Sequence, residues 1–320
     1  MKNDNTPVDI DFAEAAVPHY ARRGIVTMFM IMLGFTFFSA SMWVGQQLAD
    51  GLDFWGFLGS LILGGIILGI YTGLLGYVGA KTGLSLDLLS QRAFGEKGSY
   101  LPSAMTSFTQ IGWFGVGSFV SGGTATPNFA RFAKNGKAGA ITTVVAFFIG
   151  NSLMFFFGAV SSIFVGGNDI FEVMVRLNLF YLAVLVLGLN IWTTNDNALY
   201  TAGLGLANIF HQKKKPMVLL SGIIGTVASV WLYYNFCGWL NILNCTLPPV
   251  GMILVLAYFM NKEDFETDQP KLKTIDWFAV AGVILGAIVA NLLHWGIASI
   301  NGMVVAAVCY CVGQAVNKRK

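Results

Sequence analysis

Six polar residues interrupt an apolar stretch at residues 186–200, VLGLNIWTTNDNALY. They fall within eight positions, and helical spacing of i, i+3, i+4 and i+7 would place four of them on one face: Asn190, Thr193, Thr194 and Asn197. Amide and hydroxyl groups in hydrocarbon are costly unless they meet a partner, an ion or water. One or two such groups usually bond only to a neighbouring helix. Six within two turns favour a binding site for an ion or a polar ligand.

A second candidate site lies in the stretch SFTQIGWFGVGSFVSGGTATP at residues 107–127. Gln110 and Trp113 are one helical turn apart, so an amide and an indole could face one cavity. Residues 118–124 are too rich in Gly and Ser for a firm helix, and unwound backbone at membrane depth is tolerated only where it lines a cavity or is buried in protein. A single aromatic is more often a core or lipid-facing residue. Together, these features favour a pocket in which Trp113 and Phe119 stack on a planar polar ligand.

The composition places the chain in a membrane. Hydrophobic residues make up 55% of the 320 residues and charged residues 11%, whereas a soluble domain carries about a quarter charged residues. There is no basic patch with interleaved aromatics, so nucleic acid is not an expected partner. The four cysteines have no metal-ligand spacing. The sequence shows no paired nucleophile and base and no phosphate-binding loop, so we expect that the protein has no catalytic residues and is not an enzyme.

The apolar stretches predict an all-α, polytopic membrane protein of about nine segments, the first at residues 25–47. We expect a cytoplasmic tail at residues 1–23, a single transmembrane domain at 24–317 and a cytoplasmic end at 318–320. Apart from Lys2 and Arg176, every Lys and Arg precedes the first segment, lies in alternate loops or ends the chain. The positive-inside rule then places both termini in the cytoplasm. The four-residue spacing of Gly65, Gly69 and Gly73 predicts a helix-packing face.

The charge rule meets a conflict at residues 101–130. The basic loops on either side, residues 81–97 and 131–137, both belong inside, yet two full crossings between them would need roughly forty apolar residues and a turn. The stretch is therefore either a re-entrant segment or a single crossing against the rule.

A set of motifs resembles the nucleobase–cation symporter family, in its purine–cytosine permease type: LGFTFFSASMW (33–43), LGYVGAKTGL (75–84), QIGWFGVG (110–117), FVSGGT (119–124), GNSLMFFFGA (150–159), LGLNIWTTNDNALY (187–200) and TLPPVG (246–251). The resemblance implies the LeuT-type fold of two inverted five-helix repeats. It implies sodium-coupled import of cytosine by alternating access across a bacterial inner membrane, with no obligate protein partner. A purine or other nucleobase permease, and a transport-defective remnant or structural membrane protein, stay open as alternatives.

The resemblance also assigns residues to two linked sites. It implies a substrate site made of Gln110, Trp113, Ser118, Phe119, Ser121 and Asn190. It implies a site for the co-transported sodium ion made of the Phe38 backbone carbonyl, Asn190, Thr193 and Thr194. Asn190 belongs to both sites and would join the cation to the base.

The chain departs from the family pattern at one junction. In the family, QIGWFGVG lies on the third helix and SFVSGGT on the sixth, but here they abut at Gly117 and Ser118. About ninety residues, enough for the intervening helices, are therefore missing after Gly117. The fold is expected to be incomplete, with residues 101–130 as a fused or re-entrant segment.

Overall fold

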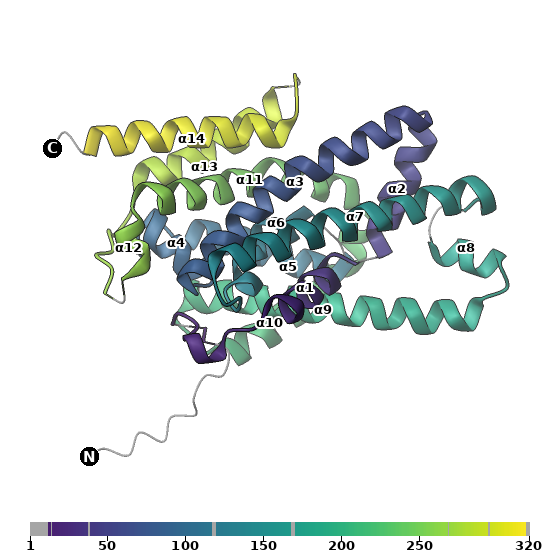
Figure 1. Ribbon diagram of the computed structural model, residues 1–320, viewed down its shortest axis with the longest axis horizontal. Helices are drawn as coiled ribbons and strands as arrows, with labels where there is room; N and C mark the ends of the chain where they lie inside the picture. Colours follow the sequence, from purple (N-terminus) through teal and green to yellow (C-terminus); the bar gives the residue numbers. More distant parts are fainter. Residues whose placement is uncertain are drawn as a thin grey trace, which may run out of the picture.

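The computed structural model describes residues 12–317 except positions 14, 38, 117–119, 168–169, 268 and 294. The described part is a bundle of helices, and its one β-bridge, between Arg23 and Ala133, is isolated (Figure 1). Five of the described helices contain stretches long and apolar enough to cross a membrane: Phe54–Thr82, Gly136–Val165, Lys214–Leu232, Asn241–Met260 and Ala298–Asn317. The all-α, polytopic prediction is confirmed.

The first apolar segment is broken into two helices. It was expected as one span at residues 25–47, but α1 covers Ile25–Thr36 and α2 covers Ser39–Gly51. Phe37 ends α1 with φ −87° and ψ 81°, outside the helical region. Residues that leave helical geometry at membrane depth expose backbone polar groups, which must find partners from other helices. The break therefore places free backbone polar groups inside the bundle.

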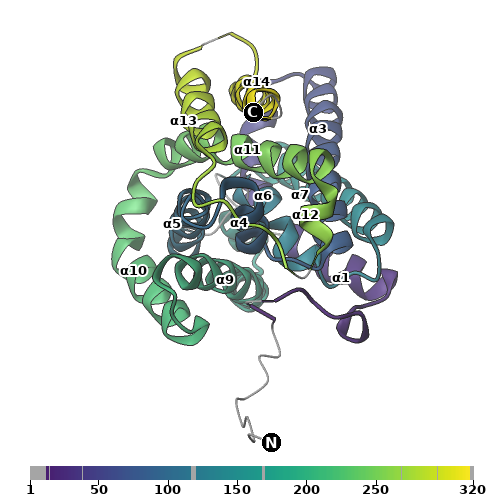
Figure 2. The same ribbon diagram turned by 90° about the vertical axis from the view of Figure 1, so that its left-hand side faces the viewer.

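The remaining long helices are α3 (Phe54–Thr82), α7 (Gly136–Val165), α9 (Phe180–Phe210), α10 (Lys214–Tyr234), α11 (Phe236–Met260), α13 (Trp277–Leu292) and α14 (Ala298–Asn317). Most of them run roughly along the long axis of the bundle (Figure 1), whereas α10 is seen from the side in Figure 2 and runs across that axis. Two short helices, α8 (Ile170–Arg176) and α12 (Lys262–Glu266), lie in connections. α9 continues through the polar cluster without interruption, so the predicted helical spacing of that cluster applies.

Glycines of α3 form a packing face against α7, as their spacing predicts. A Cβ atom at Gly65 would lie 2.9 Å from the Phe148 ring, and one at Gly76 would lie 2.6 Å from Oγ1 of Thr143. Backbones approach this closely only where side chains are absent. The α3–α7 pair thus forms a rigid wall of the bundle.

This close approach predicts a large difference between two glycines of α3. Gly76→Leu should destabilise the protein by about 1–3 kcal/mol, because the new side chain would clash with Thr143 and the α7 backbone. Gly64→Leu is the matched control, since nothing lies within 4 Å of a Cβ atom there. The melting temperature of the detergent-purified protein measures both. Equal losses in the two variants would contradict this packing face.

Residues 101–130 form a re-entrant pair of helices, α5 (Tyr100–Val116) and α6 (Val120–Ala130). α5 begins where α9 ends: the Tyr100 hydroxyl lies 2.9 Å from Nε2 of His211. α6 ends beside the last turn of α3, where a Cβ atom at Gly79 would lie 2.8 Å from Cα of Pro127. Both C-terminal ends, of α3 and of α9, lie at the same end of the bundle (Figure 1). The stretch therefore enters and returns to that end, and the conflict with the charge rule disappears.

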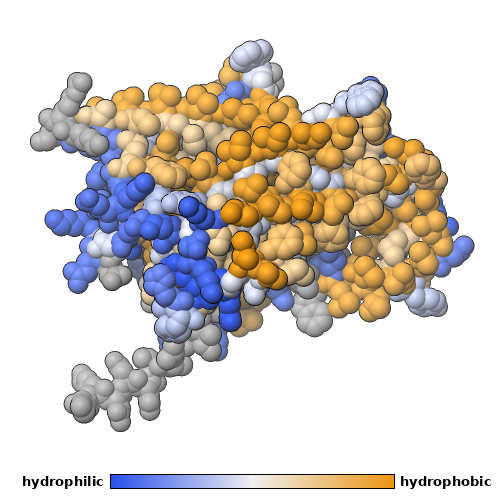
Figure 3. All heavy atoms as spheres, viewed as in Figure 1, coloured by the Kyte–Doolittle hydropathy of each residue, from blue (hydrophilic) through white to orange (hydrophobic). Residues whose placement is uncertain are grey.

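Charge separates the two ends of the bundle. The basic loops gather at the end where α3 and α9 finish, which is the hydrophilic side on the left of Figure 3. At the opposite end lie Asp50, Asp53 and Glu172, and the one described base there, Arg176, pairs with Glu172 at 2.6 Å. The apolar surface between the ends is continuous in Figure 3. This arrangement is typical of a protein that spans a bilayer.

Candidate substrate and cation site

Asn190 connects α9 to the break in the first apolar segment. Its Nδ2 donates a hydrogen bond of 2.8 Å to the backbone carbonyl of Phe37. The carbonyl is open to this donor because Phe37 leaves the helical conformation. An amide from one helix thus satisfies a backbone group freed on another, which is how broken helices persist at membrane depth.

Gln110 and Trp113 lie buried on α5, with exposed fractions of 4% and 3%. Trp113 packs in an apolar cluster whose other buried members are Ala198, Leu232, Trp239, Leu243 and Leu247, from α9, α10 and α11. The position of Trp113 follows from the close packing of α5 along α9, where Ser107 donates to the carbonyl of Ala202 at 3.1 Å. The cluster fixes the indole between three helices.

The helix α9 carries both features of the candidate site but holds them at different heights. Ala198, which shares the cluster with Trp113, is eight residues from Asn190, or about 12 Å of helix rise. A planar base contacting both α5 and Asn190 would therefore have to lie along α9 between these two levels. Phe38, Ser118 and Phe119 fall outside the described residues, as do the side chains of three further predicted site residues on α6 and α9: Ser121, Thr193 and Thr194.

The acid in the polar cluster points away from the bundle. The side chain of Asp196 is exposed, while its neighbour Asn195 has a buried Oδ1 with no hydrogen-bond partner in the described part. Because successive residues of a helix face different directions, the cluster divides into an inner and an outer side. The inner side is the part available to a ligand.

A buried polar network at the basic end was missed by the sequence analysis. Its centre is Asp87 on α4 (Leu86–Phe94), a helix capped by Ser85, whose hydroxyl accepts from the amide of Leu88 at 3.3 Å. Oδ1 of Asp87 accepts from the Ser103 hydroxyl at 2.5 Å, and that hydroxyl also accepts from Nδ2 of Asn208 at 2.8 Å. The network ties α4, α5 and α9 together.

Arg131 completes the network from the end of α6. Its side chain is fully buried, although it lies at the start of the basic loop at residues 131–137. Nη1 donates to the carbonyl of Phe12 at 2.8 Å, and Nη2 donates to the Tyr200 hydroxyl at 2.7 Å. Nε donates to the carbonyl of Asn128 at 3.2 Å. Phe12 and Tyr200 are distant from Arg131 along the chain, so no local motif marks these two contacts.

Asp87 should make stability depend on pH. Burial raises the pKa of Asp87 from 3.8 to about 6, against the opposing effects of the Ser103 hydrogen bond and the Arg131 charge. The folded state then holds the proton more tightly than the unfolded chain, so stability is greatest below the unfolded value and falls as pH rises through about 6. Acidification from neutral pH to about pH 5 should raise stability by about 1 kcal/mol, with about 3 kcal/mol reached only below the unfolded pKa. Melting temperatures of wild type, Asp87→Asn and the exposed control Asp50→Asn test this, and an unchanged pH slope in Asp87→Asn would contradict it.

A permease family resembles the chain over nearly its whole length. A family model for permeases for cytosine/purines, uracil, thiamine and allantoin matches residues 16–125 and 115–315. The cytosine permease of Escherichia coli strain K12 is 36% identical over 405 aligned positions, covering 98% of this chain and 96% of that protein. The allantoin permease of Bacillus subtilis strain 168 is 34% identical over 82 residues, which are 26% of this chain and 16% of that permease.

Solved structures confirm the fold class. Mhp1, a nucleobase-cation-symport-1 family transporter, superposes in a closed conformation with bromovinylhydantoin bound at a TM-score of 0.78 and 14% identity, covering 95% of this chain and 94% of that one. The inward-facing conformation of Mhp1 gives a TM-score of 0.75 at 15% identity, covering 95% and 93%. At such identity the likeness shows the fold, which is the predicted LeuT type.

The alignments also locate the shortened region. An alignment of 405 positions that includes 98% of 320 residues leaves about 90 positions that this chain does not fill. The two ranges matched by the family model overlap at residues 115–125, where α5 gives way to α6. Both agree with the length and place of the predicted gap. The relatives are permeases and not enzymes, so the chain is a membrane protein that belongs to the permease family for cytosine/purines, uracil, thiamine and allantoin.

Proposed function

We propose that the protein is a secondary active transporter that imports cytosine together with sodium by alternating access. The cytosine permease of E. coli, 36% identical, supports the choice of cytosine over a purine or another nucleobase. In this proposal Gln110, Trp113 and Asn190 contact the base, together with Ser118, Phe119 and Ser121. An amide, an indole and a phenyl ring are suited to the edges and faces of a flat heterocycle.

The observation that carries the proposal is the hydrogen bond between Asn190 and the carbonyl of Phe37. It joins α9 to the one break between α1 and α2, so the two helices meet at a polar point inside an apolar bundle. Polar groups at membrane depth that face a broken helix are typical of ion and substrate sites in transporters.

The proposed cation site offers the ligands that a hard monovalent cation prefers. Its donors are all oxygens: the carbonyl of Phe38, the amide of Asn190 and the hydroxyls of Thr193 and Thr194. Hard cations prefer such ligands. With Nδ2 directed to Phe37, Oδ1 is the acceptor end of the Asn190 amide that a cation would take. Sodium bound there would hold α9 against the α1–α2 break and so favour the state that binds the base.

The basic end of the bundle faces the cytoplasm in this proposal, and the membrane is a bacterial inner membrane. The concentration of Lys and Arg at one end supports this orientation by the positive-inside rule. Residues 1–23 and 318–320 would then lie on the cytoplasmic side, around a single transmembrane domain at 24–317. The re-entrant pair α5–α6 would open toward the cytoplasm.

A second candidate is a non-transporting membrane protein that keeps the fold. The roughly 90 unfilled alignment positions favour it, because they would normally supply helices that pack around the moving core. Uptake of radiolabelled cytosine, with sodium and with choline in its place, in cells that lack their own permease separates the two. Sodium-dependent uptake supports the transporter. Membrane insertion without uptake or binding would support the second candidate.

A further inference from the structure

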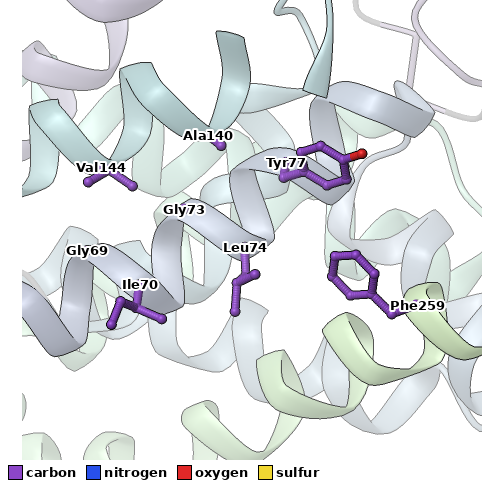
Figure 4. Close-up of a pocket in the computed structure, with 8 residues that line it drawn as sticks. All are labelled: Gly69, Ile70, Gly73, Leu74, Tyr77, Ala140, Val144 and Phe259. Carbon is purple, nitrogen blue, oxygen red and sulfur yellow. The ribbon is translucent and has the colours of Figure 1, made fainter. Parts of the chain in front are cut away.

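An apolar groove runs along the membrane-facing side of α3 and α7 near the basic end (Figure 4). Its volume is about 480 Å³, and its lining is Gly69, Ile70, Gly73, Leu74, Tyr77, Ala140, Val144 and Phe259. The glycines form its floor, because α3 and α7 approach closely there. Ile70 is 60% exposed and Phe259 43%, so the groove opens to the surroundings of the bundle. From residue 69 to 77, α3 rises about 12 Å, which gives the groove the length of part of an acyl chain.

Lysines from three helices surround the end of this groove. The ammonium of Lys262 lies 5.5 Å from the centre of the Phe259 ring. Lys81 follows Tyr77 by one helical turn and pairs with Glu266 at 3.5 Å. A Cβ atom at Gly136 would touch both Tyr77 and Lys81, so the next residue of α7, Lys137, begins its helix at the same end. All three lysines are exposed.

We propose that this groove binds an anionic phospholipid of the leaflet at the basic end, with one acyl chain in the groove and the phosphate at Lys137 and Lys262. The apolar lining suits the acyl chain, and the exposed ammonium groups of Lys137 and Lys262 suit the phosphate, although Glu263 and Asp264 follow Lys262 in α12. Glu266 neutralises only Lys81, with which it pairs, and also accepts from the Tyr258 hydroxyl at 2.8 Å. The carboxylate of Glu266 is thus held by Lys81 and Tyr258.

A second copy of the chain fits this surface less well. Two copies related by a two-fold axis along the membrane normal would bring identical surfaces together at the same depth. The lysines of one copy would then face those of the other, and like charges repel. A lipid avoids this repulsion because its phosphate has the opposite sign.

Photo-crosslinking tests the proposal in the full-length protein. The protein is reconstituted in vesicles of equal parts phosphatidylcholine and phosphatidylglycerol, with a diazirine on the acyl chain of one lipid at a time, and labelled peptides are mapped by mass spectrometry. Phosphatidylglycerol should label Leu74 and Phe259 several-fold more than the phosphatidylcholine probe does. Labelling around Ile223, an exposed position on α10, should show no such preference.

Matched variants separate the roles of charge and shape. Lys137→Gln and Lys262→Gln should each lower the preference for phosphatidylglycerol by about fivefold. The control Lys213→Gln, an exposed lysine in the loop after α9, should leave it unchanged. Ala140→Phe should reduce labelling by both lipids because it fills the groove. Equal labelling by the two lipids, Gln variants that match the control, or crosslinks to a second copy at these residues would overturn the proposal. The readout does not depend on cytosine transport.

Discussion

Replacing Asn190 with alanine should abolish sodium-dependent cytosine uptake. The side chain joins α9 to Phe37 and is proposed to hold both cation and base, so its loss removes cation binding and base binding together. Coupling between two ligands is commonly 5- to 150-fold, and this factor should fall to about one in the variant. Initial uptake rates measured with sodium and with choline give both the rate of cytosine uptake and its stimulation by sodium.

Asn235→Ala is the matched control for Asn190→Ala. Nδ2 of Asn235 also donates to a backbone carbonyl, that of Trp231, at 2.9 Å, but within its own helix region and away from the break. The control should transport as wild type does. Uptake and sodium stimulation that both survive in Asn190→Ala would refute the idea that one residue serves both ligands.

Replacing Arg131 with methionine should cost about 3–5 kcal/mol of stability, the largest loss expected for any single substitution discussed. Methionine keeps much of the apolar volume but removes the hydrogen bonds to Asn128, Phe12 and Tyr200 and the positive charge that acts on Asp87. Buried polar partners left without a donor lose stability by their own desolvation. The melting temperature of the purified protein measures the loss.

Two further variants show whether the loss comes from burial. Arg176→Met removes an exposed ion pair with Glu172 and should cost no more than about 1 kcal/mol. The double variant Arg131→Met, Asp87→Asn should be less destabilised than the sum of its single variants, because it also removes the uncompensated acid. If Arg131→Met melted at the same temperature as Arg176→Met, the buried network would have no such role.

Much of the architecture could be predicted from local patterns. Apolar length defined the long helices, the spacing of Gly65, Gly69 and Gly73 defined the face that packs on α7, and charge placement defined the two ends. The same charge rule exposed the anomaly at residues 101–130, and the structure resolves it as a re-entrant pair. These features depend on periodicity and on loops, which a sequence displays directly.

Contacts between distant segments could not be predicted in the same way. The first apolar segment was expected to be one continuous span, because Ser39 and Ser41 are tolerated inside helices, but the structure breaks it after α1. The burial of Arg131 could not be predicted, because its partners Phe12 and Tyr200 are more than sixty residues away along the chain. Such contacts arise only when helices pack, and no local propensity encodes them. The roles of Gln110, Trp113 and Asn190 were implied by family motifs and remain proposals.

Calorimetric titration of cytosine into the purified protein tests the central claim most directly, because it measures the site without requiring the transport cycle. With sodium present, cytosine should bind, and replacing sodium by choline should weaken the affinity by about 5- to 150-fold. The reverse titration, sodium into the protein with and without cytosine, should show the same factor. A correctly inserted, folded protein that binds cytosine in neither condition would contradict the account.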